Sequence, residues 1–522
     1  MKKYILLATL AMASMPLLAQ ETYENANLAT GDLNGTARYV GMGGAMEALG
    51  GDISVIETNP AGIGVFRRSN ISMTLGMVSQ EGAQDFGGGH TTNFSFDQIG
   101  FVWANRISST NFVNFGFNYH KSRNFNQILS AANRLDNASQ SKATKTKNDK
   151  GILYDTYMDK NGNVVPDFDY SFSSCTILDD LYARNLNYDS GSNTWNYFNG
   201  EEYVFDRYQT GYISQFDFNL SGSVNYRFMW GLTLGIHDVH YSRYTEYGEN
   251  LIGGYGVLPV DLGVTITDDR IITGTGASLS GGVIFMPVED LPLRFGVSIS
   301  TPTFYDLKSS SYTTYEDNTG WSDATEDEYD FKLNTPWKFG LSAGHVVNNS
   351  LALGLSYELS DYRNLDSRVN VDGDWDDYSS SESDKVMNRH TDATLKAVHT
   401  LKAGLEFKPA PEVSMRLGYN YVSPMYQKEG YKDTWLDSPG SYHSSTTDFT
   451  NWEATHRITC GLGLNLDNWF LSAAYQYSVQ KGNFAPFDFY YDPEDAAYDN
   501  ITDLVKVDNK RHQVMFTAAY SF

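Results

Sequence analysis

The feature that most constrains this chain is a two-residue alternation of apolar and polar side chains in segments of about ten residues. In SLALGLSYELS, residues 350–360, an apolar or aromatic side chain recurs at every second position from Leu351 to Leu359. Successive side chains of a strand point to opposite sides of a sheet, whereas a helix repeats every 3.6 residues. The alternation therefore predicts strands, and strands with one apolar face are typical of a barrel wall in lipid.

The pattern recurs along residues 69–522 and predicts an all-β fold, a transmembrane antiparallel β-barrel of about 14 strands. The strands are predicted near 70–79, 96–105, 111–121, 213–227, 229–241, 274–286, 292–301, 335–346, 350–360, 396–407, 413–423, 455–465, 468–479 and 510–522. Short turns alternate with long connections, which in outer-membrane barrels face outwards. We predict outer loops at 80–95, 122–212, 242–273, 302–334, 361–395, 424–454 and 480–509. The longest, 122–212, is a candidate for ligand capture.

Both ends of the chain indicate the cell outer membrane. Residues 1–19 place Lys2 and Lys3 before a short apolar run that closes with small residues, which predicts a cleaved secretory signal peptide. The last strand, RHQVMFTAAYSF, ends on Phe522. A terminal aromatic residue of this kind resembles the signal that the barrel-assembly machinery recognises, so we expect that machinery and outer-membrane lipid as partners.

Composition excludes several classes of function. The net charge of −25 argues against nucleic acid, which requires a basic surface. The acidic stretches fit solvated outer loops, with divalent-cation bridging to lipopolysaccharide as the alternative. Two cysteines, Cys175 and Cys460, make neither a disulfide framework nor a metal site. Cys460 alternates with Ile458, Leu462 and Leu464, which predicts that it faces lipid as a small apolar residue. We therefore assign no metal and no cofactor, and we expect a monomer.

Residues 20–68, between the signal and the first strand, are rich in glycine and too short for a domain. A barrel of this width would leak unless something filled it, so a plug inside the lumen is predicted. The stretches GMGGA at 41–45 and DISVIETNPAGIG at 52–64 resemble the N-terminal hatch of FadL-type long-chain fatty acid transporters. The hatch motif of that family matches Asn59, Pro60, Ala61 and Gly62 here.

The resemblance implies passive uptake of hydrophobic molecules such as long-chain fatty acids, with lateral escape through a gap at a kinked strand. It leaves the ligand open among fatty acids, aromatic hydrocarbons and haem. A secretion-system or surface-assembly component on the same barrel, similar to PorV-like proteins of Bacteroidetes, remains the alternative. From the residues alone, Asn59 can form an Asx-type turn, and Pro60 followed by Gly62 and Gly64, which tolerate positive φ, predicts a rigid turn that connects the plug to the first strand.

Five cations alternate with apolar residues in predicted strands and should therefore face the lumen, since a charge facing lipid costs about 2–4 kcal/mol. They are Arg294, Lys338, Lys402, Arg416 and Arg457. These cations could meet a ligand carboxylate. Alternatively they neutralise acids such as Asp52, Glu57, Asp217 and Glu406.

Enzymatic activity is not expected. The sequence GLSAG at 340–344 matches a hydrolase pattern, but that pattern works on a strand-to-helix turn, and here it lies inside an alternating strand. Within HDVH at 237–240 the two histidines are three positions apart, so on a strand they point to opposite faces.

Overall fold

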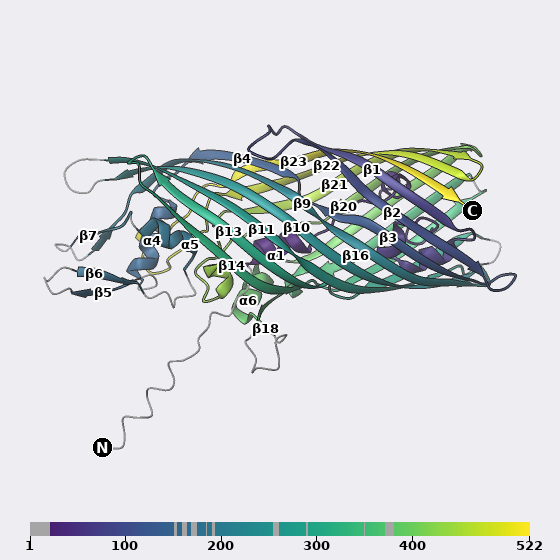
Figure 1. The fold of residues 1–522 in the computed structure, drawn as a ribbon, viewed down its shortest axis with the longest axis horizontal. Helices are drawn as coiled ribbons and strands as arrows, with labels where there is room; N and C mark the ends of the chain where they lie inside the picture. Colours follow the sequence, from purple (N-terminus) through teal and green to yellow (C-terminus); the bar gives the residue numbers. More distant parts are fainter. Residues whose placement is uncertain are drawn as a thin grey trace, which may run out of the picture.

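The computed structural model describes residues 21–150, 154–158, 164–168, 175–183, 185–189, 194–253, 260–288, 291–348, 350–370 and 381–522. The predicted signal peptide, residues 1–19, lies outside these ranges. Figure 1 shows long strands running along one axis, with the C-terminus at one end and helices α4 (Gln140–Asp149) and α5 (Ile177–Ala183) at the other.

Within the described residues, fourteen antiparallel strands close into one barrel, which confirms the predicted fold class. Most strands pair with their neighbours along the chain, and β1 finally pairs with β23, from Asn70 opposite Ser521 to Glu81 opposite Lys510. Closure satisfies backbone groups that lipid could not. The wall strands are β1 (Asn70–Glu81), β2 (Thr92–Arg106), β3 (Phe112–Asn124), β9 (Asn199–Val224), β10 (Phe228–Gly253), β11 (Val260–Phe285), β12 (Leu293–Ser300), β15 (Lys338–Val347), β16 (Leu351–Asp361), β19 (Ala397–Ala410), β20 (Val413–Val422), β21 (Phe449–Leu466), β22 (Trp469–Ala485) and β23 (Val505–Ser521).

Further strands continue the wall or form hairpins. They are β4 (Gln127–Arg134), β5 (Tyr154–Met158), β6 (Val164–Phe168), β7 (Asn187–Asp189), β8 (Thr194–Asn196), β13 (Phe304–Asp317), β14 (Ser322–Asn334), β17 (Asp366–Asn370) and β18 (Ser381–Ser383). Two predicted loops, 242–273 and 302–334, are therefore mostly strand, and that part of the prediction was wrong. The reason is that lipid-facing alternation stops where the hydrocarbon ends, whereas Thr, Tyr and Ile continue to favour strands.

Two prolines interrupt the wall at one level. The strands β12 and β15 pair up to Ser300 opposite Lys338, and β13 and β14 resume from Phe304 opposite Asn334. The same register places Pro302 opposite Pro336. Proline has no backbone N–H to donate, so the ladder breaks on both strands and the β13–β14 hairpin continues beyond the break.

The outer face of the barrel is apolar and the inner face is polar, as predicted. On β16, Leu353 and Leu355 are 41% and 58% exposed, whereas Gly354 and Ser356 between them are buried. Cys460 on β21 is also exposed, on the face predicted to meet lipid. The exposed apolar side chains recur on strand after strand and form the surface that meets hydrocarbon.

The helices are short, and those that precede β1 are buried against the inner wall. We call residues 21–66 the N-terminal segment. Its helix α2 (Ala37–Gly41) contacts β20, β21, β22 and β23, and Figure 1 shows helix α1 (Thr22–Ala29) among the wall strands. The remaining helices are α3 (Val55–Thr58), η1 (Pro60–Val65), η2 (Tyr362–Asn364), α6 (Lys385–Thr394), α7 (Pro439–Tyr442) and η3 (Ala496–Tyr498). None of the helices in the described ranges has the length and apolar character of a bilayer span.

Candidate functional site

The Asn-Pro-Ala-Gly motif at 59–62 lies on the inner side of the wall, between α3 and β1. The side chain of Asn59 caps η1, because its Oδ1 accepts a hydrogen bond from the backbone N–H of Ala61 at 3.2 Å. This is the predicted Asx-type turn. A Cβ added to Gly282 on β11 would collide with Asn59, and one added to Gly231 on β10 would collide with the motif's backbone. The motif therefore sits directly against two wall strands.

Gly62 and Gly64 do not use the positive φ that glycine tolerates. Pro60, with its fixed φ, starts a right-handed 3-10 turn instead, and both glycines lie within that turn. These glycines are needed for close packing. A Cβ on Gly62 would collide with the side chain of Val55, and one on Gly64 would lie 2.5 Å from the carbonyl oxygen of Gly222 on β9.

Two of the predicted lumen cations tie the wall to the N-terminal segment. Lys402 Nζ on β19 lies 2.7 Å from Glu47 Oε1, and both side chains are buried. Lys338 Nζ on β15 lies 3.6 Å from Glu57 Oε1. Both lysines point into the lumen, as their strand parity predicted, and both also line the cavity described below. Their contact with a ligand stays a prediction.

The three predicted arginines are also partnered inside the barrel. Arg416 Nε donates to Glu406 Oε2 at 2.6 Å, and Arg38 of α2 binds the same carboxylate at 2.9 Å. Arg457 Nη2 lies 3.6 Å from Asp32 Oδ1. Arg294 donates to the backbone carbonyl of residue 49. The neutralisation alternative therefore accounts for most of these charges, with many of the acids supplied by the N-terminal segment.

Of the other acids named from sequence, Asp217 on β9 lies 3.3 Å from His120, and Asp52 accepts a hydrogen bond from Thr36 at 2.8 Å. Ser342 of the hydrolase-like stretch lies inside β15, not on a strand-to-helix turn. His237 is buried while His240 is exposed, so the two histidines do point to opposite faces.

Sequence reasoning missed a row of inward-facing wall glycines that receive the N-terminal segment. Gly354 on β16, Gly404 on β19 and Gly418 on β20 would each place a Cβ on the backbone of residues 42–45. Any larger residue at these positions would push the segment off the wall. The signal was available in the sequence, since each glycine stands at a lumen-facing position of an alternating strand.

A cavity of about 330 Å³ lies between the N-terminal segment and the outer half of the wall. Its lining mixes aromatic and ionisable side chains. Tyr305 and Tyr362 come from the wall and η2, and Lys338, His237 and Glu57 lie at the side of the motif. A ligand in this cavity would meet apolar ring faces together with hydrogen-bonding groups.

Glu57 fixes α3 to the wall through two partners. His120 Nε2 on β3 lies 3.3 Å from Glu57 Oε2, and Lys338 approaches the other oxygen. Burial opposes ionisation of Glu57, but the hydrogen bond from His120 and the charge of Lys338 outweigh it and lower its pKa below the ordinary value. The carboxylate is therefore charged at neutral pH and holds the segment two residues before Asn59.

The wall lacks backbone pairing between β2 and β3 on the outer side of Gln98 opposite His120. Beyond this point β2 pairs with β1 only, and β3 pairs with β9. Asn34 of the N-terminal segment bridges the opening, because its Nδ2 donates to Asp97 Oδ1 of β2 at 3.2 Å and to the Lys121 carbonyl of β3 at 3.0 Å.

This opening lies in the lipid-facing band. Phe94 and Phe96, on the stretch of β2 that does not pair with β3, are 89% and 36% exposed on the outer surface. A second contact crosses the same opening, because Lys121 Nζ of β3 donates to Ser95 Oγ of β2 at 3.1 Å. Side chains rather than a backbone ladder thus close the wall here, and part of that closure comes from the N-terminal segment.

The described part of the predicted loop 122–212 packs over the outer end of the barrel. Lys147 of α4 lies 2.7 Å from Asp179 of α5, and both are fully buried. The lysine also donates to Thr434 from a distant loop at 3.2 Å. Burial opposes protonation of Lys147, but Asp179 outweighs it and raises its pKa. These contacts make a cap, and ligand capture by it stays a prediction.

The fold and the buried N-terminal segment define a class, the closed antiparallel β-barrel of 14 wall strands with an internal segment. Among solved structures the chain is similar to a Pseudomonas aeruginosa FadL homologue, with a TM-score of 0.50, 12% identity, and coverage of 95% of this chain and 100% of that one. It is also similar to the toluene transporters TbuX of Ralstonia pickettii (TM-score 0.46, 11% identity, 94% and 99% coverage) and TodX of P. putida (0.45, 11%, 94% and 99%). No family model and no curated protein matches the sequence. The first of these likenesses supports the fold.

Proposed function

We propose that this protein is an outer-membrane channel for passive uptake of hydrophobic small molecules, in which residues 20–68 act as the hatch. The observation that carries the proposal is the combination of an N-terminal segment buried against the inner wall and a wall opening bridged by Asn34 of that same segment. Fold similarity to a FadL homologue agrees with this reading.

A route follows from the geometry. A ligand passing the outer cap would reach the cavity beside Tyr305, and the hatch would block its direct path to the periplasm. Movement of Asn34 would open the gap between β2 and β3 towards lipid. Releasing two hydrogen bonds costs about 1–3 kcal/mol in total, which thermal motion supplies readily. An apolar molecule gains free energy by leaving sideways into hydrocarbon rather than into water.

The hatch also explains how the barrel avoids leakage of hydrophilic solutes. Ion pairs at Glu47, Glu57 and Asp32 hold it against several wall strands at once. Charge pairs inside the lumen are costly to separate, so the parts of the hatch that carry Glu47 and Glu57 stay in place while the side chain of Asn34 moves. Small local movement would then suffice for a ligand, without an open pore.

The test compares a deletion strain with the same strain carrying the gene on a plasmid. Cells are given radiolabelled palmitate or toluene, and periplasmic cargo is measured in parallel. Uptake should fall on deletion and return with the plasmid, while exported proteins stay normally distributed. Unchanged uptake with proteins stranded in the periplasm would overturn the proposal and support the secretion alternative.

A further inference from the structure

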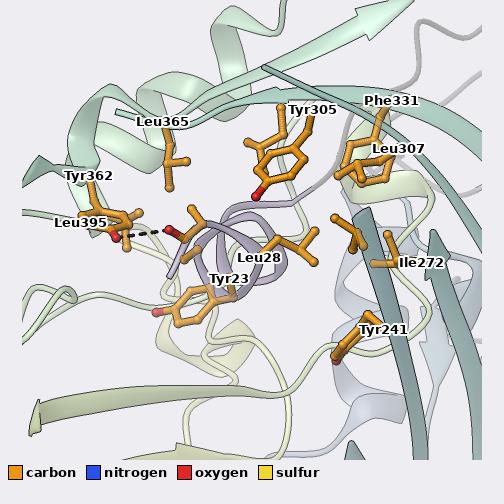
Figure 2. Packing of buried hydrophobic residues seen from close by; sticks show 14 of the residues in the cluster. Tyr23, Leu28, Tyr241, Ile272, Tyr305, Leu307, Phe331, Tyr362, Leu365 and Leu395 are labelled. Carbon is orange, nitrogen blue, oxygen red and sulfur yellow. Dashed lines mark hydrogen bonds between the residues drawn. The ribbon is translucent and has the colours of Figure 1, made fainter. Parts of the chain in front are cut away.

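Helix α1 fills an apolar chamber in the outer half of the lumen. Figure 2 shows Tyr23 and Leu28 of α1 surrounded by wall and loop side chains, among them Tyr305, Leu307 and Phe331. Tyr362 Oη donates to the carbonyl oxygen at the C-terminal end of α1 at 3.2 Å. Without α1 this chamber would be an apolar site large enough for a helix face.

Two arginines converge on the one carboxylate that α1 brings into the chamber. Arg270 Nη1 on β11 lies 2.8 Å from Glu24 Oε2, and Arg243 Nη1 on β10 lies 3.4 Å from Glu24 Oε1. Asp268 balances one of the two positive charges, since it lies 2.8 Å from Arg243. All four side chains are buried. If Glu24 left, one buried positive charge would remain without a counter-ion, which is strongly unfavourable.

The charges of this cluster are fixed near neutral pH. Burial opposes ionisation of Glu24, but Arg270 and then Arg243 outweigh it and lower its pKa. The chamber thus requires an occupant that combines an apolar body with a single negative charge. Glu24 and its helix meet that requirement from within the chain.

We propose that α1 is a built-in stand-in for the ligand, and that the chamber binds an amphipathic monocarboxylate whose carboxylate replaces that of Glu24 between Arg243 and Arg270. The inference rests on the proposed function and adds the chemistry of the binding site. In the absence of ligand, Glu24 of α1 is the counter-ion of the buried arginines, and in its presence the ligand carboxylate takes that place.

Helix α1 is held by side-chain hydrogen bonds and lies beside a cavity. Towards α6, the Oγ1 atoms of Thr22 and Thr391 lie 2.9 Å apart, and Thr22 also contacts His390 Nδ1 at 2.9 Å. Tyr23 Oη donates to Asn451 at 2.8 Å. The cavity of about 330 Å³ runs along α1 and is lined in part by Glu24 itself. An incoming chain can therefore occupy space beside the helix before it displaces the carboxylate.

The experiment locks α1 in place. In a full-length variant with Cys175→Ala and Cys460→Ala, Thr22→Cys and Thr391→Cys are oxidised to a disulfide, and binding of radiolabelled palmitate to the purified barrel is measured. Binding should weaken about tenfold or more on oxidation and recover on reduction. A matched pair, Ser79→Cys with Thr92→Cys, joins two side chains 2.9 Å apart on the outer surface and should change nothing.

Two comparisons test the carboxylate. Hexadecan-1-ol, which has the same chain without the charge, should bind about tenfold more weakly than palmitate. Glu24→Gln should strengthen palmitate binding about tenfold, because the competing carboxylate is gone, whereas Asp269→Asn, an exposed neighbour on β11, should leave it unchanged. Equal binding of the acid and the alcohol, or full binding by the oxidised Thr22–Thr391 pair, would overturn the inference. If wild-type cells take up palmitate although the inference has failed, the proposed function stands. If wild-type cells do not take up palmitate, the proposed function itself fails.

Discussion

Gly354 of β16 lies so close to the carbonyl oxygen of Ala45 that a Cβ at this position has no room. The wall is thus shaped to its own N-terminal segment, strand by strand, in a way that a simple pore would not need. Ion pairs then fix the segment where the glycines have made space for it.

Gly354→Ala should push residues 42–45 away from the wall and open a leak. Overpacking against backbone costs about 1–3 kcal/mol. The measurement is ionic conductance of the purified barrel in a planar bilayer, where the variant should conduct and the wild type should stay closed. Gly281→Ala is the control, because its Cβ would make only an ordinary contact of 3.4 Å. A closed Gly354→Ala barrel would show that the segment does not seal the lumen.

The conductance of the barrel should depend on pH through Glu57, in a direction that its pKa shift fixes. The pKa of Glu57 is lowered in the folded protein. The stabilisation that its carboxylate gives to the hatch is therefore complete above the ordinary pKa of about 4.3 and is lost as pH falls through the lowered pKa. Wild-type conductance should therefore stay low from about pH 7 to about pH 5. Glu57→Gln should conduct more at both values, and the exposed Glu326→Gln should not. A wild-type leak already present at about pH 5 would contradict the assigned role.

Glu406 should matter more for stability than an acid in an exposed ion pair. Glu406→Gln removes the carboxylate that both Arg38 and Arg416 bind, and should lower the free energy of unfolding by about 3 kcal/mol. Urea unfolding in lipid vesicles measures the change. Lys308→Met breaks an exposed pair with Glu328 and should cost much less, because solvent screens this pair. Equal losses for the two variants would mean that the buried cluster is not coupled.

The Asn59→Ala variant distinguishes a purely structural role of the Asn-Pro-Ala-Gly motif from a role in gating. Loss of the cap at Ala61 should cost about 1 kcal/mol, which a barrel of this size tolerates. We expect lost uptake of palmitate in a folded barrel, together with increased leakage of a small hydrophilic solute, because Asn59 sits against β11. If uptake and leakage both stay unchanged, the motif is a structural turn only.

Strand alternation predicted the barrel well because lipid imposes the pattern on every wall strand. Fourteen strands, the inward cations and the outward Cys460 follow from parity alone. The outer hairpins β10–β11 and β13–β14 were missed because their outward faces are no longer apolar beyond the hydrocarbon, while apolar residues such as Leu307 and Phe331 point inwards. The break at Pro302 and Pro336 was visible in the sequence, but the register that places them opposite each other comes from pairing between strands.

The contacts of the site were harder to predict, because they join segments far apart in the sequence. Asn34 meets Asp97 and Lys121, and Glu24 meets Arg243 and Arg270, only after the barrel has closed around the N-terminal segment. The alternation along the strand predicted that Lys338 faces inwards, but it could not predict which acid Lys338 contacts. The wall glycines were readable from position, and a search for lumen-facing glycine would have found them.

The most direct test of the account seals the gap between β2 and β3. In the variant without native cysteines, Ser95→Cys and Lys121→Cys are joined by a short bismaleimide in whole cells, and uptake of radiolabelled palmitate is measured. The account predicts that uptake is lost in the cross-linked cells and kept when Ser79→Cys and Thr92→Cys join β1 to β2, strands that are already paired. Full uptake through the sealed barrel would contradict lateral passage at Asn34 and with it the central claim.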